Sequence, residues 1–171
     1  MKKLIAIVCT LVMCLGLMTA CMEKVEDNSG AANNDPKGVT LVYGETKIDV
    51  TVGQWEAKRT QIKTNDVSLG TAKEYEFTGV TLAALMEMAG AADCTKILVK
   101  SSDGWSAEVA AEDAKNYSIM ITDGYADGKE IPADAGGPIK MVFPATEHPE
   151  LNDKYDTWAW QWYVSEIEFV K

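Results

Sequence analysis

The chain has 171 residues, of which 47% are hydrophobic and 25% are charged, a composition typical of a folded globular protein. It is too apolar for a disordered chain and too mixed for a protein with several membrane spans. Its 26 acidic residues outnumber 16 Lys and Arg, giving a formal net charge of −10. This acidic balance argues against nucleic acid as a partner.

The first segment of the chain is typical of an export signal. A short basic start, Met1–Lys3, precedes an apolar run, Leu4–Met18, that is short for a membrane-spanning helix. The stretch Leu17–Cys21 resembles the lipobox of bacterial lipoproteins, in which the cysteine is acylated and becomes the new N-terminus. We therefore expect residues 1–20 to be a signal peptide and Cys21 to anchor an extracellular, outward-facing protein to the cell membrane by lipid. A plain secretory signal is the alternative interpretation.

The next segment is predicted to be a flexible tether. Residues 21–37 are rich in Asn, Asp, Gly, Ser and Pro and contain almost no large apolar side chain. From residue 38 the composition becomes globular, with neither a second linker nor an internal repeat. We expect one domain over residues 38–171.

Cysteine usage excludes several classes of site. Cys9 and Cys14 leave with the signal peptide and Cys21 carries the lipid, so that Cys94 remains alone. A disulfide framework and a cysteine-based zinc or iron–sulfur site within one chain are therefore excluded. Because no histidine stands near Cys94 to lower its pKa, a packed thiol is favoured over a reactive one.

Short β-rich runs and one helical pattern follow one another along the domain. A hairpin around Gly44-Glu45 joins the first two strands. Thr81 is placed to cap a helix over residues 82–89, whose apolar residues recur at helical spacing and which Gly90 ends. The expected strands are 39–43, 47–52, one ending near 75–80, 97–99, 105–109, 119–121, 139–143 and 162–170. This pattern predicts an α+β fold with a single mixed, mainly β domain.

The dipeptide Asp127-Gly128 has two interpretations. Together with Asp123 and Asp134 it echoes the ligand spacing of a calcium loop. Pro132 interrupts that pattern, and a type I′ hairpin turn accounts for the same residues more simply.

Five motifs, in order, resemble the molybdopterin-binding domain of the sulfite oxidase family. They are Phe77–Leu82 (FTGVTL), Ser102–Ser106 (SDGWS), Asp127–Pro132 (DGKEIP), Gly136–Pro144 (GGPIKMVFP), and Gln161-Trp162 with Ile167–Phe169. The resemblance runs from about Phe77 to Lys171 and implies the fold of that domain.

The resemblance also implies a cofactor, molybdopterin, with a cysteine thiolate on its molybdenum and cations on its phosphate. The thiolate would come from the segment before Phe77, yet residues 59–75 contain no cysteine. Lys140 stands where the family has arginine, and Gln161 where it has lysine, which weakens the expected binding of the phosphate. The resemblance therefore supports the fold of this family more strongly than its enzymatic activity.

Polar and aromatic residues of the motifs supply the candidate site. The expected ligand-binding residues are Asp103, Trp105, Lys140, His148, Gln161 and Trp162. His148 is the only histidine; it is the candidate for proton transfer or, with Glu147 and Glu150, for a metal, although its loop has the composition of an exposed segment.

Two further groups of residues leave their role open. Thr64, Asn65, Asp66 and Ser68 lie where the family places the mouth of its cofactor site, but an ordinary surface loop has the same composition. Trp158, Trp160 and Trp162 alternate, so that on a strand they would share one face. That face would be either a small second core or a stacking platform for a flat ligand or a sugar.

Three functions follow from these observations. The first is a lipid-anchored, non-catalytic module that binds a small molecule or a partner in the family's cleft. The second is a molybdopterin-dependent oxidoreductase that has an atypical metal ligand such as Asp66, or no protein ligand on the metal. His148 or a nearby tyrosine would transfer the proton, and a redox partner could take part. The third is a carbohydrate-binding surface protein. The first requires no bound metal.

Overall fold

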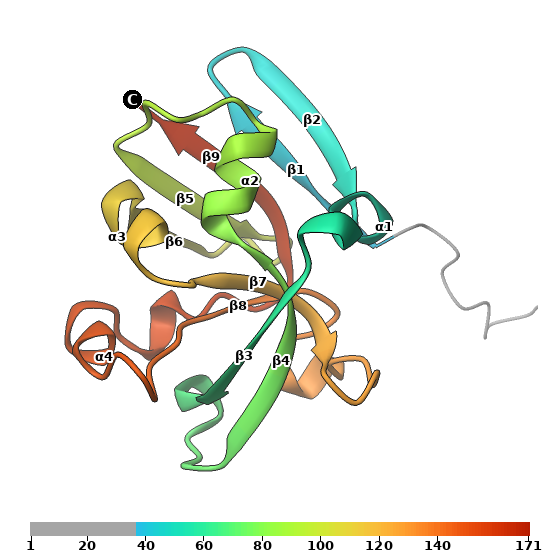
Figure 1. The fold of residues 1–171 in the computed structure, drawn as a ribbon, viewed down its shortest axis with the longest axis vertical. Coiled ribbons are helices and arrows are strands. Elements are labelled where there is room, and N and C mark those ends of the chain that lie inside the picture. Colours follow the sequence, from blue (N-terminus) through green and yellow to red (C-terminus); the bar gives the residue numbers. More distant parts are fainter. Residues whose placement is uncertain (1–36) are drawn as a thin grey trace, which may run out of the picture. The chain divides into compact units, whose positions relative to one another are not determined.

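The computed structural model describes residues 37–171 of the chain, and Figure 1 shows their fold. The expected signal peptide, the lipidated Cys21 and nearly all of the expected tether lie outside the described residues. Within the described part, no helix combines the length and the apolar character that crossing a membrane would require.

A five-stranded sheet has the order β2-β1-β9-β5-β6. Strands β1 and β9 run parallel, and every other neighbouring pair is antiparallel. Ile167 of β9 lies opposite Leu41 of β1 on one side and Val99 of β5 on the other, and all three side chains are buried. The alternation of strand residues thus directs one row of branched apolar side chains into the core. The strands are β1 (Gly38–Tyr43), β2 (Thr46–Thr51), β5 (Lys96–Ser101), β6 (Ser106–Ala110) and β9 (Val164–Val170).

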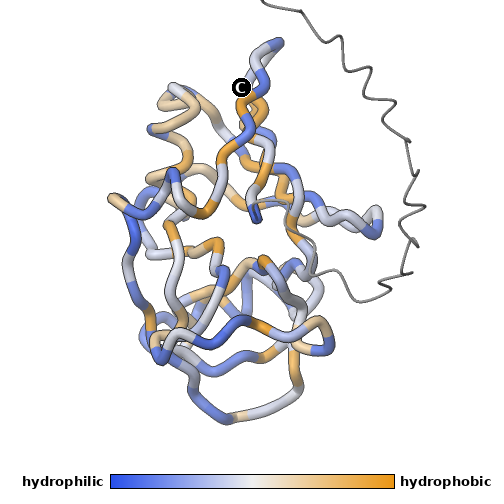
Figure 2. Tube along the Cα trace, turned by 90° about the vertical axis from the view of Figure 1, so that its right-hand side faces the viewer, coloured by the Kyte–Doolittle hydropathy of each residue, from blue (hydrophilic) through white to orange (hydrophobic). Residues whose placement is uncertain are grey.

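A four-stranded antiparallel sheet has the order β3-β4-β7-β8. Its central strand β4 contributes Phe77 and Val80 to the core, and β8 is buried along its whole length. Hydrophobic and hydrophilic residues follow one another along the strands, as the tube coloured by hydropathy shows (Figure 2). The strands are β3 (Thr60–Asn65), β4 (Glu74–Thr81), β7 (Met120–Tyr125) and β8 (Lys140–Val142).

The helices are short and pack against a shared apolar core. The Thr81 hydroxyl accepts a hydrogen bond from Ala84 N, and Leu82, Leu85 and Met86 are buried, as the sequence predicts for this helix. The α-helices are α1 (Val52–Trp55), α2 (Leu82–Met88), α3 (Ala111–Asn116) and α4 (Glu150–Lys154). One-turn 3-10 helices occur at Glu56–Lys58, Val67–Leu69, Ala133–Ala135 and Thr157–Ala159.

The α+β prediction with a mainly β domain is confirmed, whereas one expected strand arrangement is wrong. The alternating tryptophans do not lie on a strand, because β9 begins only at Val164. The Asp156 carboxylate accepts a hydrogen bond from Trp158 N and starts a 3-10 turn there. Trp158 is therefore exposed while Trp160 is buried, so the two rings do not share a face.

The expected type I′ turn at Asp127-Gly128 is also wrong in detail. Gly128 N donates to Tyr125 O, and Gly128 has a φ of +82°, but Asp127 does not have a positive φ. The chain thus forms a three-residue hairpin loop with glycine in the left-handed position rather than a two-residue I′ turn. The calcium alternative also fails, because Asp123 pairs with Arg59 and Asp127 pairs with Lys129.

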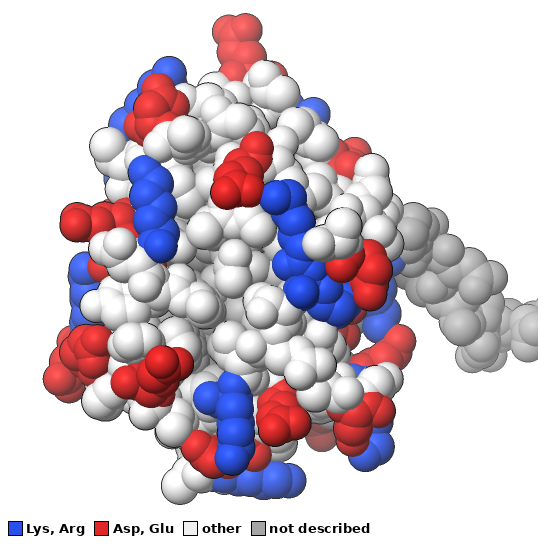
Figure 3. Space-filling view, in the orientation of Figure 1, with Lys and Arg blue, Asp and Glu red and all other residues white. Residues whose placement is uncertain are grey.

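Charged side chains of both signs cover the surface. On the face drawn in Figure 3, acidic and basic residues lie interspersed, with uncharged surface between them. Most ion pairs between these side chains are exposed to solvent, and such pairs contribute little to the stability of the fold.

Candidate functional site

A hollow of about 330 Å³ opens where the β5–β6 turn, the Thr157–Ala159 turn and the start of β9 meet. Its aromatic lining consists of Trp105, Trp158, Trp160, Trp162 and Tyr163. Its polar lining consists of Ser68, Ser101, Asp103, Thr157 and Gln161. Aromatic walls with a few polar groups are the usual chemistry of a small-molecule site.

Two exposed tryptophans form part of the wall. Trp105 follows the turn between β5 and β6, and Trp158 lies in the 3-10 turn that Asp156 caps. Their ring centroids are 5.6 Å apart with 21° between the ring planes. Trp105 is 61% exposed and Trp158 is 71% exposed, which is unusual for side chains of this size.

The segment Gln161–Tyr163 supplies another wall and is held by the glycines of the GGP motif. Gly136 has a φ of +91°, and a β-carbon there would lie 2.5 Å from Cγ of Trp162. Tyr163 N donates to Gly136 O, and Tyr163 is itself in the left-handed region with a φ of +51°. Only glycine at position 136 lets the Trp162 ring lie against the backbone.

A fully buried ion pair lies beneath the hollow. Lys140 Nζ is 2.6 Å from Asp66 Oδ2, and the two side chains are 0% and 1% exposed. The ammonium also donates to Ser68 Oγ at 3.0 Å and to Ala135 O at 3.1 Å, and lies 5.3 Å from the centre of a Trp162 ring. Burial lowers the pKa of Lys140, and the charge of Asp66 opposes that effect. Every donor of this cation is used within the protein.

Ser68 connects this ion pair to the hollow. Its hydroxyl donates to Asp66 Oδ1 at 2.6 Å and accepts from Nε1 of Trp162 at 3.0 Å. Ser68 N donates to the same Asp66 oxygen and so fixes the 3-10 turn that follows β3. Both carboxylate oxygens of Asp66 are therefore engaged.

The other polar side chains around the hollow are also largely engaged. Gln161 Oε1 accepts from the Ser101 hydroxyl at 2.7 Å, and Gln161 Nε2 donates to Trp158 O at 2.8 Å. By contrast, Nε1 of Trp160 is buried without a hydrogen-bond partner among the described residues. Asp103 is exposed and is the only formally charged residue among those that line the hollow.

His148 lies apart from this arrangement. Its ring contacts Tyr117 edge-on at 4.8 Å, and its nitrogens are 3.4 Å from a Glu150 oxygen and 4.0 Å from a Glu147 oxygen. It is not among the residues that line the hollow. Over residues 37–171, no three His, Cys, Asp or Glu side chains gather as a metal site would require.

Cys94 is also remote from the hollow and is buried. Burial raises the pKa of its thiol, which disfavours the reactive thiolate. The predicted packed role agrees with this position.

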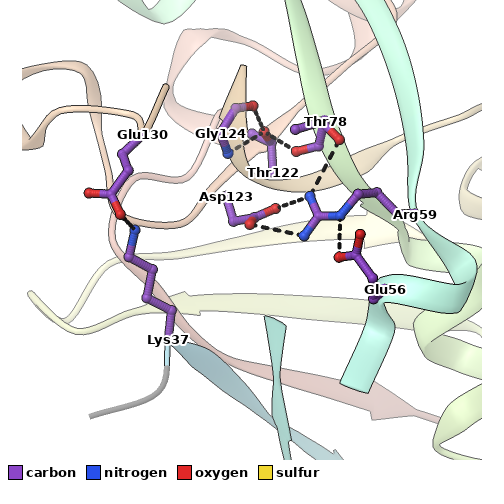
Figure 4. A network of polar contacts seen from close by, with 8 residues as sticks. All are labelled: Lys37, Glu56, Arg59, Thr78, Thr122, Asp123, Gly124 and Glu130. Carbon is purple, nitrogen blue, oxygen red and sulfur yellow. Dashed lines mark hydrogen bonds and ion pairs between the residues drawn. The ribbon is translucent and has the colours of Figure 1, made fainter. Parts of the chain in front are cut away.

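A second polar network links Arg59, the residue directly before β3, to β7. The guanidinium of Arg59 donates to both carboxylate oxygens of Asp123, at 2.7 and 3.1 Å, and to Glu56 at 2.7 Å (Figure 4). The hydrogen bond to Asp123 raises the pKa of Arg59. Beside it, Lys37 pairs with Glu130. Each of these charged groups has a partner of opposite sign, and we interpret the network as structural.

The structure brings together Asp103, Trp105, Gln161 and Trp162 of the expected site, with Lys140 beneath them and His148 elsewhere. The surface-loop interpretation fails for Thr64 and Asp66, which are buried. Ser101, Thr157 and Tyr163 were not predicted as site residues. The signal for Ser101 was its position directly before the SDG turn, at the end of a strand.

Comparison with known proteins identifies the family and the fold. Residues 46–148 match the family model described as the oxidoreductase molybdopterin binding domain, so the chain belongs to that family. Among solved structures, the fold is similar to the crystal structure of the sulfane dehydrogenase SoxCD from Paracoccus pantotrophus, with a TM-score of 0.56 and 13% sequence identity. The match covers 78% of this chain but 38% of the SoxCD chain. A search of curated proteins gives no match.

The residues present do not fit the cofactor that this family implies. No cysteine lines the hollow, and the only cysteine of the described part is the remote Cys94. The lining also contains no lysine, arginine or histidine, and the nearest buried cation, Lys140, is neutralised by Asp66. A soft metal lacks its thiolate here, and a phosphate would face the carboxylate of Asp103.

Proposed function

We propose that this member of the oxidoreductase molybdopterin-binding family is an outward-facing, lipid-anchored binding module that works without a molybdenum cofactor. In this proposal the hollow takes a small ligand against its tryptophans. The protein would act by holding that ligand near the membrane and not by redox chemistry.

One observation carries the proposal: the buried contact between Lys140 and Asp66. Asp66 is the metal ligand that the enzyme hypothesis offers in place of cysteine, and its two oxygens already accept from Lys140 and Ser68. Lys140 is the cation that would bind the phosphate, and its ammonium already donates to Asp66, Ser68 and Ala135. Recruiting either group for a cofactor would break a buried ion pair at a cost of about 3–5 kcal/mol.

The test is the cofactor content of the full chain. The chain would be purified from a host that synthesises molybdopterin, next to a family member that retains the cysteine ligand as a positive control. Molybdenum would be measured by elemental mass spectrometry, and pterin by the fluorescence of its oxidised form. We expect background levels for this chain and near-stoichiometric levels for the control. Metal and pterin at the level of the control would revive the oxidoreductase hypothesis and refute this one.

A further inference from the structure

The hollow combines aromatic walls with a single carboxylate, and this combination indicates the chemical class of its ligand. We propose that it binds a small organic cation, an alkylated ammonium group, against the indole rings of Trp105 and Trp158 with Asp103 as the counter-charge. This inference rests on the proposed function, because it assigns the ligand class of the same hollow.

The first argument is the exposed tryptophan pair. Trp105 and Trp158 stack on each other with centroids 5.6 Å apart, so no ligand fits between them, but the two side chains remain 61% and 71% exposed. The large exposed hydrophobic residues of the described chain are these two and Ile48, and only the two tryptophans border the hollow. Exposed aromatic faces at a hollow indicate contact with a ligand. The π face of an indole attracts cations more strongly than that of tyrosine or phenylalanine.

The second argument is charge. Asp103 is the only formally charged residue in the lining, and its one hydrogen bond within the described residues comes from Trp105 N at 3.3 Å. Lys140 is neutralised by Asp66 below the floor. The hollow therefore presents one negative charge beside aromatic faces, which complements a cation and disfavours an anion.

The third argument separates a cation from a sugar. A sugar requires several free hydrogen-bonding groups, yet Gln161, Ser101 and Ser68 are used within the protein, and the buried group of the lining that lacks a partner among the described residues is a single donor, Nε1 of Trp160. The indole nitrogen of Trp162 is used as well. An alkylated ammonium group needs a π face and a nearby negative charge but few hydrogen bonds, so its requirements match the groups that remain.

The test compares a cation with a neutral molecule of the same shape. Choline and its uncharged carbon analogue, 3,3-dimethyl-1-butanol, would each be titrated into the full chain, followed by tryptophan fluorescence and calorimetry. We expect choline to bind with saturation and at least about tenfold more tightly than the analogue. Trp158→Ala should weaken choline binding about two- to fivefold, and Asp103→Asn should reduce the preference for choline over the analogue. Ile48→Ala is the matched control, an exposed apolar residue away from the hollow, and should bind choline like the wild type.

The outcomes separate this inference from the proposed function. Equal affinity for the two molecules, absence of choline binding, or binding of maltose instead would refute the proposal that the ligand is a cation. None of these results would contradict the proposed cofactor-free binding module. Molybdenum and pterin in the same preparation would overturn the proposed function itself. Circular dichroism of each variant checks that the exposed substitutions leave the fold intact.

Discussion

At the scale of single residues, the buried ion pair is the feature that most separates this chain from a cofactor-binding one. Lys140 and Asp66 stand 74 positions apart in the sequence and meet with nearly complete burial. The sequence indicated Lys140 as a weaker phosphate ligand and Asp66 as a loop residue or metal ligand. Neither interpretation contained their contact, because no local pattern encodes a pairing over that separation.

Replacing Lys140 by methionine should destabilise the fold strongly. The variant Lys140→Met keeps an apolar stem but leaves the Asp66 carboxylate buried without its cation. We expect the free energy of unfolding to fall by about 3–5 kcal/mol, measured by urea denaturation. Lys63→Met, which removes an exposed partner of Glu74, should leave the urea midpoint nearly unchanged. Equal effects of the two substitutions would show that burial gives the Lys140 pair no special weight.

Tyr155 should make stability depend on pH in the alkaline range. Its side chain is buried and donates to Asp113, and burial with that hydrogen bond raises the pKa of Tyr155 to about 12. An unfolded tyrosine titrates near 10, so the folded state holds this proton more tightly and its stabilising effect is complete below about pH 10. It is lost as the pH rises from about 10 towards about 12.

The measurement is the free energy of unfolding of wild type and Tyr155→Phe across that range. The wild type should lose up to roughly 2–3 kcal/mol more than Tyr155→Phe between about pH 10 and about pH 12. All other tyrosines and lysines are common to both proteins, so their contributions cancel. Parallel curves would contradict the raised pKa.

At the scale of elements, sequence patterns predicted those segments whose own residues determine the structure. The helix after Thr81 has a cap, helical spacing and a glycine stop, and the strands β5 and β9 alternate clearly. Strand β3 was not predicted because its sequence, TQIKTN, has only one large apolar residue. The strand lies at the edge of its sheet and pairs with β4 alone. The tryptophan segment was misassigned because alternation alone cannot distinguish a strand from a capped 3-10 turn.

The GGP motif can be tested through its contact with Trp162. Gly136→Ala would place a methyl group 2.5 Å from Cγ of that ring and force a left-handed alanine. We expect a loss of about 1–3 kcal/mol in the free energy of unfolding and an altered tryptophan emission spectrum.

Gly70→Ala is the matched control for that substitution. Gly70 also has a positive φ, +63°, but a β-carbon there would meet nothing within 4 Å. It should lose stability for the backbone reason alone, with the emission spectrum unchanged. A spectral change of the same size in both variants would mean that Gly136 does not act through Trp162.

At the scale of the whole molecule, the fold and the hollow support different functions. The fold is that of a cofactor-binding family, whereas the residues that line the hollow do not fit the cofactor. The fold of the molybdopterin-binding domain is present, and its motifs were legible in the sequence because glycines, turns and buried strands leave local signals. The binding chemistry of the hollow could be predicted from the sequence only in part. Four of its predicted residues do line it, but their internal hydrogen bonds, which decide what they can offer a ligand, depend on the three-dimensional arrangement.

The proposed attachment to the membrane is a property of the full chain and depends on one residue. Cys21→Ser removes the thiol that would be acylated, while the described domain stays unchanged. We expect the wild type to incorporate labelled palmitate and to partition with detergent, and Cys21→Ser to do neither. Equal partitioning of both proteins would contradict the lipid anchor.

The most direct test of the central claim is the cofactor content of the native protein. The chain would be isolated from cells of the organism that makes it, under conditions that preserve bound molybdopterin, and assayed for molybdenum and pterin per chain. We predict background levels of both, because the Lys140–Asp66 pair is closed and none of the described residues that line the hollow is a cysteine, which leaves the cofactor without its ligands. Near-stoichiometric molybdenum with pterin would contradict that prediction and make this protein an oxidoreductase with a new metal ligand.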